Sequence, residues 1–411
     1  MLLLLAQISG CAGVVCSPGM EEPYGSRKLP VWIRDVEDAV TLPDGDVVVV
    51  ARRYPTATVV TRIGGRGDEE VALLPEMAPT DVAPSLILTD GRWWFSRMGL
   101  HDPGTSVFFV SGGATIQQSE RSVDGYGDIV VWLPVRGVEP RGLLLSGGNE
   151  QPALRVVEIT PSGAKTLGAF TWWQRSSQMV RRHDSRWSAE SLGDGRFVVA
   201  AIDGPPGETA LRVRLVGGEA ASDEVVPCRL ADQPIDTAVG PTGRLAVVGL
   251  SEKNEVVGVM PDVAHPESAQ CRVLSAAGEV AARPGYGTPT VVWAGDRFIA
   301  AWVRDDGTVR ACELDELQRS RVIVDIGREA DVDRPLRQLL QAGADAVTFT
   351  WRDRSGDLFT RELPNKLTAY ALMMEFRSLV CAAVATGGER DEGIRHLFPL
   401  PLRELIWGPS S

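Results

Sequence analysis

The chain has 411 residues, of which 44% are hydrophobic and 23% charged, a composition typical of a globular protein and not of a disordered one. Its formal net charge of −12 argues against nucleic-acid binding, because neutralising phosphates requires a basic surface. The sequence contains no run of 18 apolar residues, so it predicts no transmembrane helix.

The first residues predict an export signal. Met1 to Ala6 form a short apolar run, and Ile8-Ser9-Gly10-Cys11 follows. This tetrapeptide resembles the cleavage box of bacterial lipoproteins, in which the cysteine is acylated. The resemblance implies that residues 1–28 are a signal sequence and tether, that Cys11 is lipidated, and that the protein is secreted or anchored in the cell envelope. No Lys or Arg precedes the run, so a cytoplasmic chain with an apolar N-terminus remains the alternative.

A strand-turn-strand pattern then repeats seven times. Its turns recur at intervals of 46 to 53 residues, at Asp44-Gly45, Asp90-Gly91, Arg141-Gly142, Asp194-Gly195, Thr242-Gly243, Gly295-Asp296 and Gly343-Ala344. Repeats of this length are typical of propeller blades. We therefore predict an all-β fold, a seven-bladed β-propeller of four-stranded antiparallel blades, over residues 29–364.

The sixth and seventh repeats show how the ring closes. The sixth predicts four strands, at 289–293, 297–303, 308–314 and 321–324. The seventh predicts three, at 336–340, 345–351 and 357–363. Because open sheet edges are a liability, we expect the apolar run at residues 29–33 to supply the missing strand. The alternative is that 29–33 is a linker.

Residues 365–411 follow a different pattern. Apolar residues recur at helical spacing from Leu367 to Ala382, with no Pro between Asn365 and Ala385, which predicts a C-terminal helix. The tail at 388–411 has no assigned role.

The cysteines do not predict a metal site, because no two have CxxC spacing. Cys228, Cys271 and Cys312 lie late in three successive repeats. Equivalent positions in blades that radiate from an axis are usually too far apart for a disulfide, so we expect buried free thiols.

Function in a propeller lies in the loops at the channel mouth. The candidate binding residues lie at or just before the inner strands and are Arg34, Asp35, Asp38, Asp81, Tyr126, Asp128, Asp236, Tyr286, Asp333 and Arg334. A ring of such carboxylates could hold Ca²⁺, but we favour the interpretation that each Asp caps a turn, because no DxDxDG-type loop supplies several ligands from one segment. We expect no cofactor otherwise.

One local resemblance is to sialidase-like propellers. Trp32-Ile33-Arg34-Asp35, followed by the Asp44-Gly45 turn and the run from Val47 to Arg53, resembles the opening of that family. The resemblance implies that Arg34 grips a sugar carboxylate and that Asp35 acts as the acid. The family's Ser-x-Asp-x-Gly-x-Thr-Trp motif is absent, and no nucleophile can be assigned.

The prediction for function is therefore a binding or scaffold module with a protein or glycan partner. The alternatives are a sialidase-like or other glycan-acting hydrolase and a cytoplasmic scaffold.

Overall fold

In the computed structural model the chain divides into two units, Ser26–Asn365 and a second that combines Met1–Gly25 with Lys366–Ser411. The structure describes residues 27–367, except for 30–35, 54–56, 65–66, 75–84, 102–103, 113–116, 124–128, 148–152, 172–185, 204–209, 219–222, 232, 263–264, 266–267, 277, 280, 282–288, 315–322, 334–335, 337–338, 344–345 and 366. The lipidation site Cys11, the predicted C-terminal helix and the tail lie outside the described residues.

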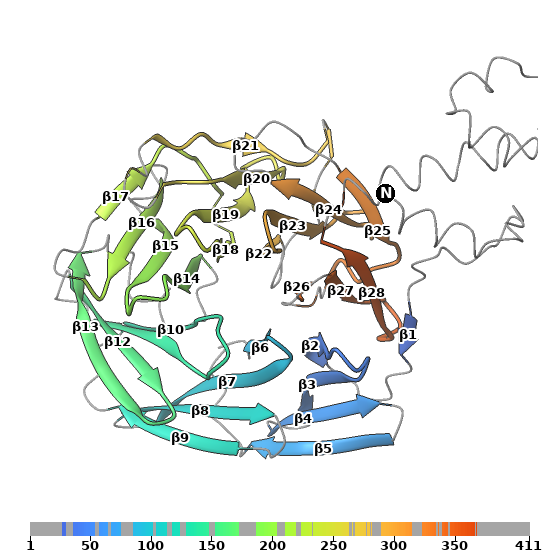
Figure 1. Cartoon of the computed structure of the whole chain (residues 1–411), viewed down its shortest axis with the longest axis horizontal. Coiled ribbons are helices and arrows are strands. Elements are labelled where there is room, and N and C mark those ends of the chain that lie inside the picture. The colour runs from blue at the N-terminus through green and yellow to red at the C-terminus, as the bar shows by residue number, and fades with distance from the viewer. Residues whose placement is uncertain are drawn as a thin grey trace, which may run out of the picture. The chain divides into compact units, whose positions relative to one another are not determined.

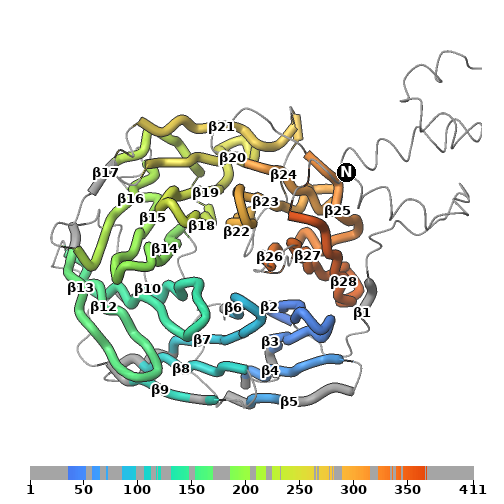
Figure 2. Tube along the Cα trace, viewed as in Figure 1, coloured from blue at the N-terminus to red at the C-terminus, as the bar shows by residue number. Residues whose placement is uncertain are grey.

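The unit Ser26–Asn365 is a seven-bladed β-propeller, as the repeats predict. Its strands form seven four-stranded antiparallel sheets, which are arranged in a ring around a common axis (Figure 1). The trace in Figure 2 passes from blade to blade in sequence order, with the first strand of each blade innermost. Only the closing blade combines strands from both ends of the unit.

The first four blades each contain four consecutive strands. Blade 1 consists of β2 (Val36–Thr41), β3 (Val47–Arg53), β4 (Ala57–Gly64) and β5 (Gly67–Leu74). Blade 2 consists of β6 (Ser85–Thr89), β7 (Arg92–His101), β8 (Gly104–Gly112) and β9 (Gln117–Val123). Blade 3 consists of β10 (Ile129–Pro134), β11 (Gly142–Gly147), β12 (Ala153–Thr160) and β13 (Gly163–Thr171). Blade 4 consists of β14 (Trp187–Ser191), β15 (Phe197–Asp203), β16 (Ala210–Val216) and β17 (Asp223–Val226).

The last three blades complete the ring. Blade 5 consists of β18 (Asp236–Val239), β19 (Leu245–Leu250), β20 (Val256–Val259) and β21 (Arg272–Val273). Blade 6 consists of β22 (Thr290–Trp293), β23 (Phe298–Val303), β24 (Val309–Leu314) and β25 (Ile323–Gly327). Blade 7 consists of β26 (Leu340–Ala342), β27 (Ala346–Arg352), β28 (Leu358–Pro364) and β1 (Arg27–Leu29).

The core lies between neighbouring blades, because each blade buries both of its faces. All seven residues of β15 are buried. Val199 and Ala201 pack in the cluster shared with blade 3, whereas Val198, Ala200 and Ile202 pack in the cluster shared with blade 5. Burial on both faces explains why the second strand of a repeat reads as a continuous apolar run and not as an alternation.

The N-terminal strand closes the ring, as predicted, but with different bounds. β1 pairs antiparallel with β28, with Arg27 opposite Thr360 and Leu29 opposite Leu358. Leu29 is therefore the only residue of the predicted segment 29–33 found in the strand, and 30–33 lie outside the described residues. The prediction missed residues 27 and 28 of the strand, because it followed an apolar run and Arg27 and Lys28 are polar.

Polar contacts fix the seam between blades 7 and 1. The buried amide of Gln341 on β26 accepts a hydrogen bond from Thr41 N (3.2 Å) and donates one to Ala39 O (3.2 Å). Arg352 on β27 donates to Val36 O at 2.7 Å. Both side chains thus bind the backbone of the inner strand of blade 1, which sets the register between the first blade and the last.

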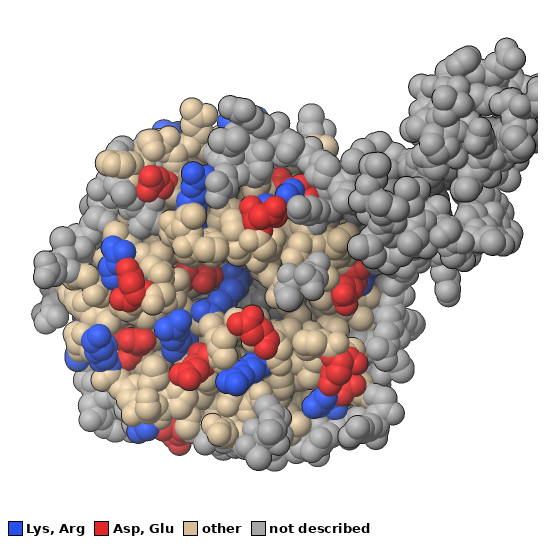
Figure 3. All heavy atoms as spheres, in the orientation of Figure 1, with Lys and Arg blue, Asp and Glu red and all other residues tan. Residues whose placement is uncertain are grey.

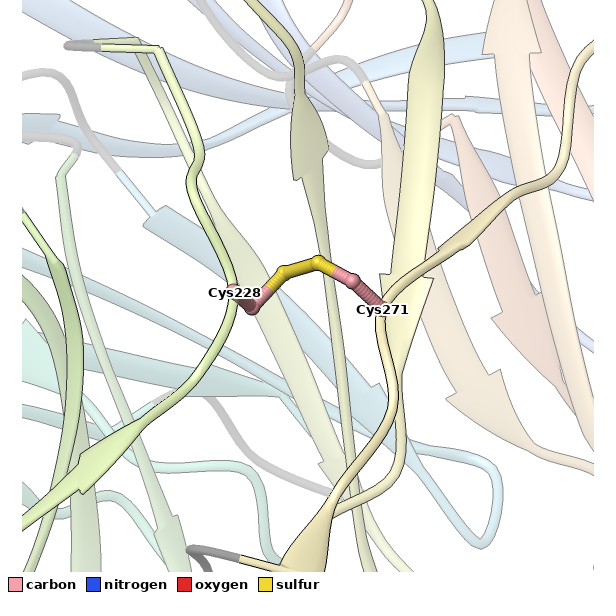
Figure 4. Close-up of a disulfide and its surroundings, with 2 residues drawn as sticks. All are labelled: Cys228 and Cys271. Atoms are coloured by element: carbon pink, nitrogen blue, oxygen red, sulfur yellow. A yellow bond between two sulfur atoms is a disulfide. The ribbon is translucent and has the colours of Figure 1, made fainter.

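A disulfide joins Cys228 and Cys271, which corrects the expectation of free thiols (Figure 4). The two Cα atoms lie 5.2 Å apart, within the range for disulfides. Cys228 follows β17 and Cys271 precedes β21, so the bond joins the outer strands of blades 4 and 5. The expectation failed because the chain beside the outer strands crosses towards the neighbouring blade, whereas strictly radial blades would keep these positions apart. Cys312 is buried in the cluster between blades 5 and 6.

Five of the seven predicted turns contain a glycine with positive φ, namely Gly45, Gly91, Gly195, Gly243 and Gly295. The third prediction is wrong, because Gly142 is the first residue of β11 and not part of a turn. A Cβ on Gly142 would lie 2.5 Å from the Trp132 ring, so this glycine allows a close approach by that ring. Blade 3 instead has a longer loop, which carries the site described next.

Candidate functional site

The loop between β10 and β11 differs from the equivalent loops of other blades. A backbone hydrogen bond closes this connection from Val135 N to Arg141 O, which encloses seven residues (135–141). The equivalent bond in blade 5, from Gly240 N to Arg244 O, encloses five (240–244), as it does in blades 1 and 4. The two additional residues let the β10–β11 loop extend a side chain towards the axis of the ring.

That side chain is Arg136, which binds two other blades. Its Nη1 donates to Glu190 Oε1 of β14 at 2.8 Å, and its Nη2 donates to both carboxylate oxygens of Asp236 on β18 at 2.9 and 2.8 Å. Nη1 also donates to the Thr237 carbonyl. We call Arg136, Glu190 and Asp236 the axial cluster. One guanidinium thereby joins the inner strands of blades 4 and 5 to the loop of blade 3.

Other residues of the β10–β11 loop also contact neighbouring blades. Trp94 of blade 2 donates from Nε1 to Gly137 O at 2.9 Å. Arg141 places its guanidinium carbon 5.8 Å from the ring centroid of Phe197 in blade 4, a cation–π contact. The seven-residue loop therefore contacts blades 2, 4 and 5, and the geometry of Arg136 is set from both sides.

Burial governs the electrostatics of the axial cluster. The side chain of Glu190 is 8% exposed, that of Asp236 19% and that of Arg136 25%. Desolvation raises the pKa of Glu190 to about 7, with a further contribution from Asp236, against the opposing effect of Arg136. Burial lowers the pKa of Arg136, but the attraction of Asp236 and Glu190 outweighs it, so the net shift is upward. Glu190 can thus gain or lose a proton near neutral pH.

Charged side chains gather around the centre of the ring. The space-filling view shows basic and acidic groups bordering a central hollow on one face (Figure 3). The axial cluster combines one positive and two acidic groups, so it carries a net charge of −1 when Glu190 is ionised and none when Glu190 is protonated. Protonation of a single side chain therefore changes the charge balance beside the axis.

Asp236, a predicted site residue, has a second role. Its Oδ2 accepts the backbone N–H of Val291 in blade 6 at 2.8 Å. Asp38, also predicted, occupies the equivalent position in blade 1, and its Oδ2 accepts the N–H of Leu86 in blade 2 at 3.1 Å. Asp38 is fully buried and its Oδ1 also accepts the N–H of Ala39. Each carboxylate ties its inner strand to that of the next blade.

A shared octapeptide pattern in the sequence marks this equivalence. Asp38 and Asp236 each open an eight-residue segment that ends at the glycine of a turn (38 to 45 and 236 to 243). The pattern therefore identifies equivalent positions correctly, and in the described structure these positions form an inter-blade contact.

Of the other predicted site residues, Asp333 alone lies in the described part of the chain. Asp333 is exposed, and its backbone N–H donates to Asp331 Oδ1 at 3.1 Å. Seven candidates lie outside the described residues, namely Arg34, Asp35, Asp81, Tyr126, Asp128, Tyr286 and Arg334.

The described residues contain neither a metal-binding group nor a membrane-spanning helix. Among them, no group of three or more His, Cys, Asp or Glu side chains is placed to hold a metal ion. Within the same part of the chain, no helix has the length and apolarity needed to cross a bilayer.

Sequence reasoning missed Arg136 and Glu190. The signal for Arg136 was the position of Gly142, which directly precedes the apolar run of the third repeat. Val135-Arg136-Gly137 lies where the other repeats place the turn. Glu190 gave no comparable signal, because one acidic residue near the end of a short strand is ordinary on an exposed sheet face.

No protein-family model matches the chain, and it has no significant match among curated proteins. Solved structures do resemble it. The structure of U3-55K aligns at 13% identity with a TM-score of 0.50, over 84% of this chain and 100% of that chain. A puromycin hydrolase structure aligns at 16% identity with a TM-score of 0.50, over 84% of this chain and 55% of that chain. At these identities the likeness concerns the propeller fold alone.

Proposed function

We propose that the protein is an exported, lipid-anchored propeller that acts as a binding or scaffold module. Its partner is a protein or a glycan, bound through loops at the channel mouth. The observation that carries the proposal is the cross-braced ring: Arg136 joins three blades at the axis while β1 closes the circle at the rim. Such a frame holds loops in fixed relative positions, as a binding surface requires.

The disulfide supports export. Bonds such as Cys228–Cys271 persist in oxidising compartments and are rare in the cytosol, where thiols are kept reduced. Together with Ile8-Ser9-Gly10-Cys11 in the sequence, this favours the cell envelope over the alternative of a cytoplasmic scaffold.

The geometry favours binding over glycoside hydrolysis. A glycosidase needs two carboxyl groups that both reach the scissile bond. Glu190 and Asp236 are a close carboxyl pair at the axis, but both are bound by the guanidinium of Arg136. That arrangement suits a brace. Calcium binding by the loop carboxylates, and the binding roles of the predicted loop residues, stay predictions.

Site-directed photo-crosslinking in the producing cell tests the binding surface. We expect a photoreactive residue in place of Tyr126 or Tyr286, each the centre of a Gly-Tyr-Gly tripeptide in the sequence, to capture a discrete protein or glycan species. The control position is Asp194, which lies in the turn after the inner strand β14, whereas Tyr126 and Tyr286 precede inner strands in the sequence. Equal capture from all three positions, or capture from Asp194 alone, contradicts the proposal.

Cysteine replacement tests the anchor. We expect Cys11→Ala to move the protein from the membrane fraction to the soluble fraction and to abolish labelling by a fatty-acid analogue. Cys16→Ala, in the same segment, is the matched control and should retain both properties. Equal labelling of the two variants refutes lipidation at Cys11. So does the absence of label from the wild type and both variants.

A further inference from the structure

We propose that Glu190 makes the brace between blades 3, 4 and 5 dependent on protons. In its charged form it holds Arg136 by an ion pair, together with Asp236. In its protonated form the ion pair is lost, and the β10–β11 loop is held to blade 5 through Asp236 and the Thr237 carbonyl. This goes beyond the proposed binding role, because it concerns control of the frame.

The geometry gives Glu190 a distinct position in the cluster. Asp236 binds one nitrogen of Arg136 through both oxygens and also accepts the Val291 N–H. Glu190 uses a single 2.8 Å contact to the other nitrogen. Loss of the negative charge on Glu190 thus weakens one arm of the guanidinium while the contacts of Asp236 remain.

The surrounding charges act on Glu190 in both directions. Arg136 and Arg141, both from the β10–β11 loop, oppose its protonation, and Asp236 on β18 favours it. On the turn after β14, Asp194 and Arg196 bind each other at 2.6 Å. Desolvation is the largest influence, and it raises the pKa of Glu190 to about 7.

The raised pKa fixes the sign of the pH effect on stability. The pKa of Glu190 is higher in the folded protein than its ordinary value of 4.5, so the folded state binds this proton more tightly. The resulting stabilisation is fully present below about pH 4.5 and is lost as the pH rises through about 7. Across that window the contribution of Glu190 to the folding equilibrium constant falls by up to about tenfold per pH unit.

The indole N–H of Trp94 is a reporter of the brace, because it binds the carbonyl of Gly137 next to Arg136. We expect its NMR signal, assigned with Trp94→Phe, to titrate in the wild-type protein with a midpoint near the raised pKa of Glu190, about 7. Glu190→Gln, which mimics the protonated form, should abolish that step. Glu313→Gln is the matched control, since Glu313 is also buried and binds Arg297 at 2.8 Å; the step should persist.

Two results of the Trp94 titration overturn the proposal. One is a wild-type Trp94 signal with no step between about pH 5.5 and 8.5. This measurement uses the wild-type protein alone, so it does not depend on the folding of a variant. The other is a step that persists in Glu190→Gln. Should that variant fail to fold, direct titration of the Glu190 carboxyl carbon in the wild-type protein decides the question: a pKa near 7 supports the proposal, and one near the ordinary value of 4.5 refutes it.

Discussion

Arg136 and Arg297 each bind one glutamate and one aspartate, but at different distances along the chain. Arg136 binds Glu190 and Asp236, which lie 54 and 100 residues away in two other blades. Arg297 binds Glu313 at 2.8 Å and Asp296 at 2.8 Å, which lie 16 residues and one residue away. We call Arg297, Glu313 and Asp296 the blade-6 triad. The same three residue types build a tie between blades in one place and a local contact in the other.

The difference indicates that the contribution of such a group to stability depends on which blades it joins and how far it is buried, and not on its residue types. Asp236 is 19% exposed, whereas Asp296 is 54% exposed. Solvent screens an exposed pair, so its contribution to stability is small. A partly buried pair that crosses blades is less screened, and removing one partner leaves a charge of the other uncompensated, so the loss is larger. The axial cluster should therefore contribute to ring stability, and the exposed arm of the blade-6 triad should not.

The largest expected effect separates these two aspartates. Asp236→Ala leaves Arg136 partly uncompensated and removes the acceptor of the Val291 N–H, so we expect a loss of about 3–5 kcal/mol in the free energy of unfolding. Asp296→Ala should cost about 0–1 kcal/mol. Urea denaturation measures both. Similar losses in the two variants would mean that crossing between blades adds nothing.

The sequence predicted the fold better than it predicted the contacts of the axial cluster and the blade-6 triad. Regular spacing of Gly-centred turns predicted seven blades, because most of these turns use a glycine with positive φ, as at Gly45 and Gly243. The long loop of blade 3 broke the pattern, and there Gly142 was mistaken for a turn residue. Contacts across blades, such as Arg136 with Asp236 or Cys228 with Cys271, depend on ring geometry that local patterns do not encode.

The second effect concerns blades 4 and 5 at their outer edge. Cys228–Cys271 ties blade 4 to blade 5 at the rim, where β21 has only two residues, while the axial cluster ties them at the axis. Because the disulfide restricts the unfolded chain, we expect Cys228→Ser with Cys271→Ser to cost about 2–4 kcal/mol. Thermal unfolding of the double variant and of the reduced wild type should agree. An unchanged midpoint would show that the axial cluster alone suffices.

The smallest effect tests an uncharged tie between blades. Gln341 joins blade 7 to blade 1 through Thr41 N and Ala39 O, with no ionic contribution. Gln341→Ala leaves both backbone groups without this partner, and we expect a loss of about 1–3 kcal/mol in urea denaturation. Gln341→Glu keeps the acceptor for Thr41 N and loses the donor to Ala39 O, so it should be no more stable than wild type. A neutral Gln341→Ala would mean that the closing seam depends on β1 and its apolar contacts.

The most direct test of the brace is a pair of double-mutant cycles. One cycle combines Arg136→Ala with Asp236→Ala, and the other combines Arg297→Ala with Asp296→Ala, each followed by urea denaturation. A cycle isolates the interaction energy between the two side chains. We predict a coupling of about 2–3 kcal/mol at the axis and less than about 1 kcal/mol in blade 6. A coupling at the axis no larger than that in blade 6 would contradict the conclusion that Arg136 braces the ring.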